Sequence, residues 1–163
     1  GMSELGDSLD RDLHLRAGET ANGRREADVV GRVLELAAAR GSDERAWALV
    51  RLAADFRALG RHDEVLRVLD AAWYLEPSEQ PELAIFSCAI GIHCDRRAYD
   101  VAMTLERDFA DRGIDLKFAR ACVRLYVDLY AETEDEEHQA RVASYRSYVE
   151  LFEAEASNSP VAA

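Results

Sequence analysis

The sequence predicts an all-α protein without a sheet, and three observations lead to this prediction. Apolar residues recur three and four positions apart in seven stretches, as on the buried face of a helix. The 163 residues include only nine glycines and three prolines, and the long stretches between them are rich in Ala, Leu, Arg and Glu, which favour helices. No stretch alternates polar and apolar residues for long enough to form a half-buried strand.

Turn and cap residues separate the predicted helices. Gly41 and Gly60 end the first two helices, and Ser42 or Asp43 can cap the second. An acidic run at residues 132–137 begins the last helix, where carboxylates complement the helix dipole. The expected helices span residues 28–40, 43–59, 63–75, 79–93, 97–111 and 116–131, followed by one that ends near residue 156.

These helices are expected to form one domain at residues 27–156. Residues 1–26 are polar and glycine-rich, so we expect a flexible N-terminal segment there, and residues 157–163 should be a flexible tail. With 48% hydrophobic residues, the chain is large enough to bury a core. No apolar run approaches the roughly 20 residues that span a bilayer, and the first residues lack the apolar stretch of a signal peptide.

The net charge narrows the classes of possible partner, and the cysteine content indicates the cellular compartment. The formal net charge of −12 weighs against nucleic acid and against an anionic membrane surface, since both attract basic proteins. The three cysteines, Cys88, Cys94 and Cys122, are an odd number without the spacing of a disulfide framework. Free thiols in a reducing compartment explain them, so we expect a cytoplasmic protein.

An internal repeat relates the second and fourth predicted helices. Leu49, Leu52, Ala53, Phe56 and Gly60 recur 34 residues later as Leu83, Phe86, Ser87, Ile90 and Cys94, matched in size and spacing rather than identity. The first unit resembles the tetratricopeptide repeat in the positions of its large, small and closing residues. Those positions are Leu49, Leu52, Ala53, Phe56, Val65, Leu69, Ala72 and Pro77.

The resemblance covers about residues 43–155 and implies a right-handed superhelix of antiparallel helix pairs. It implies about three degenerate repeats, with the stretch at 28–40 as a leading helix that covers one end of the stack. The second unit departs from the pattern because it lacks the turn glycine and the final proline, and the third is recognisable only by residue size. The layout, with the stretch at 66–77 and the closing helix at 145–153, is also similar to the small tetratricopeptide chaperones of type III secretion systems.

In the tetratricopeptide family, the first helices of the pairs line a concave face that holds a partner peptide. The resemblance therefore implies a groove, expected to be mostly apolar, with Arg57 to orient the partner and without a basic clamp for a terminal carboxylate. Each lining residue could instead belong to the core between repeats. The implied partner-binding residues are Trp47, Val50, Ala54, Arg57, Ala84, Cys88, Ile92, Leu116, Val123 and Tyr126.

The candidate metal, catalytic and aromatic sites have simpler structural explanations. Cys88 and Cys94 lie six residues apart, on different sides of one helix, and no zinc-ligand spacing is present, so no metal or cofactor is expected. The acidic run before His138 is typical of a helix start, and no catalytic motif occurs. Helical packing explains the tyrosines of the last two helices, although they could instead form an aromatic surface for a partner or a second subunit. They are Tyr126, Tyr130, Tyr145 and Tyr148.

The sequence thus predicts a non-catalytic protein–protein interaction module, an adaptor or chaperone that binds a segment of a partner protein in an apolar groove. The alternative is a structural helical-repeat subunit that self-associates, for example as a homodimer, or joins a larger assembly. A third hypothesis is a ligand- or metal-binding regulatory domain on a repeat scaffold. An open groove would favour the first hypothesis over the others.

Overall fold

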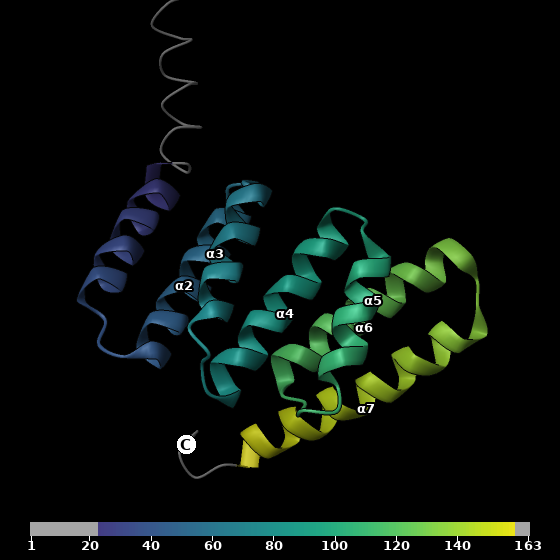
Figure 1. Ribbon diagram of the computed structural model, residues 1–163. Coiled ribbons are helices and arrows are strands. Elements are labelled where there is room, and N and C mark those ends of the chain that lie inside the picture. Colours follow the sequence, from purple (N-terminus) through teal and green to yellow (C-terminus); the bar gives the residue numbers. More distant parts are fainter. Residues whose placement is uncertain (1–22, 159–163) are drawn as a thin grey trace, which may run out of the picture.

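A computed structural model describes residues 23–158, and all regular structure in this range is helical (Figure 1). The prediction of an all-α chain is confirmed for these residues. The helix at residues 23–38 is followed by α2 (Ser42–Ala58), α3 (His62–Tyr74), α4 (Glu79–Asp95), α5 (Tyr99–Phe109), α6 (Leu116–Thr133) and α7 (Glu136–Asn158). From α2 onwards, the expected helix ends agree with the structure to within two residues.

The first helix is longer than expected. The chain is already helical at residue 23, so the expected boundary at residue 27 lies inside a helix. Residues 24–27 are good helix formers but carry no apolar stripe, and the apolar periodicity therefore missed them. The rest of the expected N-terminal segment, at 1–22, and the last part of the expected tail, at 159–163, lie outside the described residues.

The helices pack sequentially in pairs and form two layers. α2 packs against α3, α4 against α5, and α6 against α7. Within one layer α4 lies between α2 and α6 and contacts both, while α3 and α5 lie in the other layer and also touch α4 and α6, respectively (Figure 1). The layer of α2, α4 and α6 thus presents three neighbouring helices, which are the first members of the three pairs.

The turns after α2 and α4 have the same hydrogen bonds, although only one contains glycine. After α2, Gly60 has a φ of 73° and the Arg61 amide donates to the Phe56 carbonyl at 3.0 Å. After α4, Arg97 has a φ of 58° and the Ala98 amide donates to the His93 carbonyl at 2.8 Å. A non-glycine residue in this conformation costs roughly 1–2 kcal/mol. The second turn is therefore equivalent to the first despite the missing glycine.

Asp43 connects two helices of the same layer instead of capping its own. The N-cap of α2 is Gly41, without a side-chain hydrogen bond, so the expected cap by Ser42 or Asp43 is not formed. The Asp43 carboxylate instead accepts hydrogen bonds from the Ser78 amide (2.9 Å) and hydroxyl (2.5 Å) at the start of α4. The Ser78 hydroxyl and amide together hold the pKa of Asp43 below its usual value.

Two hydrophobic clusters form the core, and α4 contributes to both. One cluster joins α2, α3 and α4, and the other joins α4, α5, α6 and α7. Most residues of α4 are buried, because helices of both clusters pack against it, and only the side that faces α2 and α6 across their common layer is open in part. None of the helices in residues 23–158 is both long and apolar enough to cross a membrane.

Candidate binding groove

A groove of about 670 Å³ crosses the layer formed by α2, α4 and α6. Each of these helices contributes four or five residues to its lining. The lining residues are Val50, Ala54, Arg57 and Ala58 from α2, Ala84, Ser87, Cys88, Gly91 and Asp95 from α4, and Lys117, Arg120, Ala121 and Arg124 from α6.

Equivalent positions of the three helices face the groove. Counted along the chain, corresponding lining residues lie 34 positions apart between α2 and α4, and 33 positions apart between α4 and α6. Three rows follow from this spacing, namely Val50, Ala84 and Lys117, then Ala54, Cys88 and Ala121, then Arg57, Gly91 and Arg124. The groove therefore repeats once per helix pair, and the middle row contains only small side chains, which leaves its floor open.

Asp95 connects the two arginines of the third row. The Arg57 guanidinium donates two hydrogen bonds to Asp95, from Nε at 2.6 Å and from Nη2 at 3.0 Å, and Arg124 Nη1 donates to the same carboxylate. Burial raises the pKa of Asp95, but the hydrogen bonds from Arg57 and Arg124 outweigh it and hold the pKa below its usual value. The carboxylate is thus charged at neutral pH and fixes both guanidinium groups at one end of the groove.

Gly91 lies between Arg57 and Arg124 in the third row, and its missing side chain leaves room for the Arg57 guanidinium. A Cβ atom at position 91 would lie 2.6 Å from Arg57 Nη1, closer than a real contact allows. Glycine inside a helix costs roughly 0.5–1 kcal/mol relative to alanine. The Arg57 guanidinium lies in the space that this glycine leaves, and Arg124 Nη1 donates to the Gly91 carbonyl at 3.4 Å.

The α6 side of the groove carries two exposed cations. Lys117 and Arg120 are both exposed, and Arg120 forms an ion pair with Glu153 of α7 at 2.8 Å. The lining as a whole contains four basic residues and one carboxylate, whereas the whole chain has 20 basic and 32 acidic residues. The lining thus has an excess of positive charge, which Glu153 and Asp128 beside it offset in part through their ion pairs with Arg120 and Arg124.

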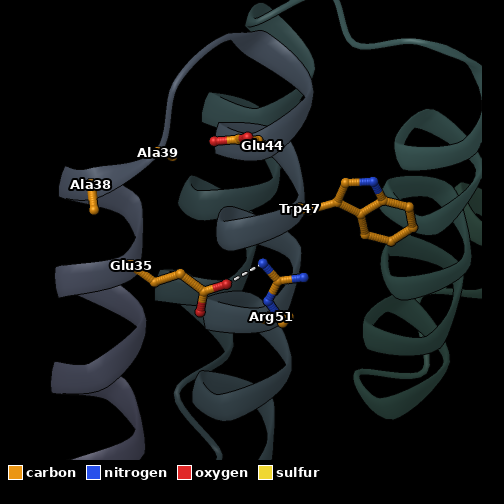
Figure 2. A pocket seen from close by; sticks show the side chains of 6 residues that line it. All are labelled: Glu35, Ala38, Ala39, Glu44, Trp47 and Arg51. Atoms are coloured by element: carbon orange, nitrogen blue, oxygen red, sulfur yellow. Dashed lines mark hydrogen bonds and ion pairs between the residues drawn. The ribbon is translucent and has the colours of Figure 1, made fainter.

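Half of the residues predicted to bind a partner lie together in this groove. Val50, Ala54, Arg57, Ala84 and Cys88 all line it. Trp47 lines a separate recess of about 370 Å³ between α2 and the helix at 23–38 (Figure 2). In Figure 2 its indole projects away from the ion pair of Glu35 and Arg51 in the same recess.

The other predicted residues do not line the groove. Ile92 is fully buried in the cluster of α2–α4, and Tyr126 is 2% exposed in the cluster of α4–α7. Val123 packs against the same cluster as Tyr126, and Leu116 is half-buried. Positions 121 and 123 differ by about 200° around a helix, so a shift of two residues turns a groove position towards the core.

The groove contains more cations than the expected Arg57, although most of its exposed lining surface is apolar. Lys117, Arg120 and Arg124 add three positive charges from α6. These residues follow one another at spacings of three and four, which places them on one face of a helix. That spacing was readable in the sequence and would have indicated the basic side of the groove.

The cysteines lack the features of reactive thiols. Cys94 and Cys122 are buried and Cys88 is partly buried, and all three are free. Burial raises the pKa of Cys88, and it raises that of Cys94 to about 11, so both thiols stay protonated at neutral pH. In the described part of the chain, no group of three or more His, Cys, Asp or Glu side chains is arranged to hold a metal ion.

Two of the tyrosines form a buried polar network around Glu106. Glu106 belongs to α5, and only 3% of this residue is exposed. Tyr126 of α6 donates to it at 2.8 Å, Tyr145 of α7 donates to it as well, and Arg141 lies 3.4 Å away. Tyr126 and Tyr145 are therefore part of the packing between helices, whereas Tyr148 is 39% exposed.

No protein-family model, curated protein or solved structure matches this chain.

Proposed function

We propose that this chain is a non-catalytic protein-interaction module that binds a segment of a partner protein in the groove across α2, α4 and α6. In this proposal the helices form a tetratricopeptide-like right-handed superhelix of three degenerate repeats with a leading helix. The observation that carries the proposal is the set of three equivalent rows of lining residues, spaced 34 and then 33 positions apart. A groove that repeats with the fold offers similar contacts along its length, which suits an extended segment.

The size of the groove supports an extended segment as its occupant. Packed helices lie about 8–10 Å apart, which separates α2 from α6 by about 20 Å. An extended chain covers that distance in about six residues. The small side chains of Ala54, Cys88 and Ala121 leave space for the side chains of such a segment.

A cytoplasmic adaptor or chaperone is the role that we propose for such a module. The three free cysteines suit a reducing compartment. A resemblance to the small chaperones of type III secretion systems, with their acidic composition and leading helix, makes a secreted or membrane-inserting protein one class of client to test.

Site-specific photocrosslinking tests the position of the binding site. Ala54 is exposed in the middle row of the groove, and a benzoylphenylalanine there should crosslink a partner protein in a lysate of the source organism. Tyr74, which is 81% exposed at the end of α3, provides the matched control position outside the groove. We expect one discrete crosslinked protein from position 54 and none from position 74, and its identity follows from mass spectrometry.

Equal crosslinking from both positions would contradict the proposal, because the groove would then not be the contact surface. A variant with Ala121→Trp, which fills the floor from the α6 side, should abolish the crosslink from position 54. Persistence of the crosslink in this variant would count against the groove in the same way.

A self-associating subunit is a second candidate, favoured by the exposed face of the leading helix. Val30 and Leu34 are 60% and 66% exposed, and Val33 beside them is also exposed. If this face joins two copies, the wild-type chain will have the molar mass of a dimer in light scattering, and Val33→Glu with Leu34→Glu will convert it to a monomer. A monomeric wild type at high concentration would exclude this candidate.

A further inference from the structure

We infer that the groove selects an acidic segment, with apolar side chains over α2 and α4 and carboxylates against α6. This inference rests on the proposed function and names the chemistry of the partner. It starts from the uneven distribution of charge in the lining, where Lys117, Arg120 and Arg124 of α6 face the groove beside Arg57 of α2. Asp95 is the single carboxylate of the lining and is already bound by two of these cations.

The two ends of the lining differ in what they can recognise. Asp95 holds Arg57 and Arg124 in position. Arg124 also pairs with Asp128 at 3.6 Å, so two carboxylates balance the two guanidinium charges. Lys117 is exposed at the opposite row, and the Arg120 pair with Glu153 is exposed on both sides, so it exchanges readily with another carboxylate. The carboxylates of a ligand therefore meet Lys117 and Arg120 first.

The remaining lining is apolar and small. Val50 and Ala54 of α2 and Ala84 and Cys88 of α4 form this part, next to Ala121. Short apolar side chains of a ligand would bury surface here, and burial contributes about 25 cal/mol per Å². A segment that combines such side chains with neighbouring carboxylates matches both parts of the groove.

The negative charge of the whole chain does not oppose this selection at close range. At physiological ionic strength, charges more than about 8 Å apart are largely screened. A bound carboxylate therefore experiences the cations of the lining rather than the total of −12. A peptide also suits the groove better than nucleic acid, because the lining offers no aromatic side chain on which a base could stack.

Synthetic peptides of matched length test the inference by fluorescence anisotropy. The probe is an end-capped peptide with alternating Leu and Ala followed by a run of Glu, compared with the same peptide carrying Gln or Lys in place of Glu. We expect the Glu peptide to bind at least about tenfold more tightly than the Gln peptide, and the Lys peptide to bind least. Added salt should weaken the binding of the Glu peptide.

A pair of charge-matched variants separates the local charge of the groove from the charge of the chain. Lys117→Glu with Arg120→Glu reverses two lining cations, and we expect about tenfold weaker binding of the Glu peptide and a gain for the Lys peptide. Arg107→Glu with Arg146→Glu makes the same change in net charge on exposed side chains of α5 and α7 outside the lining, and it should leave binding unchanged. The gain for the Lys peptide is a signal that misfolding would not produce.

Several outcomes would overturn the inference, and they leave the proposed function separately testable. Equal binding of the Glu and Gln peptides would show a groove that binds peptides without charge selection. Preferred binding of the Lys peptide, or equal losses in both variants, would contradict the inference directly. Tighter binding of a single-stranded thymidine oligonucleotide that competes with the Glu peptide would assign the groove to nucleic acid. If none of the three peptides binds, the acidic segment is excluded, and the crosslink from position 54 then decides whether the groove binds another partner.

Discussion

Gly91 and Glu106 each position side chains from other helices, Gly91 through the absence of a side chain and Glu106 through a buried carboxyl group. Gly91 acts by lacking a side chain, because the nearest atom of the Arg57 guanidinium lies only 2.6 Å from where a Cβ would be. Glu106 acts through a buried carboxyl group whose oxygens accept hydrogen bonds from the hydroxyl groups of Tyr126 and Tyr145. Neither role is visible in the sequence, because each depends on residues 20 to 39 positions away in the chain.

Tyr145→Phe should lower the free energy of unfolding by about 1–3 kcal/mol. The substitution preserves the ring but removes the Tyr145 hydroxyl from Glu106 Oε1, which then keeps only the long hydrogen bond from Arg141 at 3.4 Å. Losing a buried hydrogen-bond partner lowers stability by this order. Tyr148→Phe is the control, since Tyr148 is largely accessible and should change the unfolding free energy by less than about 0.5 kcal/mol. Urea titration of both variants measures the difference, and equal effects would contradict the network.

The helices were well predicted from sequence, whereas the cap expected at Ser42 or Asp43 is not formed and the lining of the groove was predicted only in part. Helical periodicity depends on local spacing, so α2 to α7 were located closely. The α2 and α4 sides of the groove were found because they keep the 34-residue repeat. On the α6 side, the predicted Val123 and Tyr126 lie two positions beyond the lining residues Ala121 and Arg124, and a shift of two positions turns a side chain by about 200° around the helix.

At the scale of the elements, α4 holds the groove together through Asp95. This residue is one turn beyond Gly91 and binds one arginine of α2 and one of α6. Since its neighbours belong to different helix pairs, the carboxylate links all three pairs on the groove side. This link depends on the negative charge of Asp95 and is therefore weakened when the carboxylate is protonated at low pH.

The stability that Asp95 contributes should disappear in acid. The pKa of Asp95 is lowered in the folded state, so its contribution is complete above the unfolded value of about 3.9 and is lost as pH falls through the lower folded value. Asp95→Asn should thus be less stable than wild type at pH 7, and the difference should vanish at the acid end of a urea-unfolding series. Asp108→Asn, on an exposed side chain of α5, should show no such pH dependence.

Across residues 23–158 the helices form a stack with two hydrophobic clusters, and α4 is the helix that the clusters share. Contacts run between helices that are close in sequence, and the two clusters lie on opposite sides of α4. Stability in such stacks is approximately a sum over neighbouring units, so damage to one core need not open the other.

Substitutions in the two cores should therefore open different ends of the stack. Leu125→Ala removes a fully buried side chain from the α4–α7 cluster, at a cost of about 2–5 kcal/mol. Hydrogen exchange should then increase in α5, α6 and α7 more than in α2 and α3, and Val65→Ala in the α2–α4 cluster should show the reverse. Faster hydrogen exchange to the same extent in all of these helices, in both variants, would instead indicate a single cooperative unit.

The position of Cys88 makes the groove accessible to direct observation. Its thiol is the one partly accessible thiol of the three, and it belongs to the middle row of the lining. Because burial raises its pKa, an electrophilic dye would label it slowly at neutral pH and faster in mild alkali, while Cys94 and Cys122 stay shielded until the chain unfolds. A single fluorophore could thus be attached to the native chain without mutagenesis, and its emission would report when the groove is filled and when it is empty.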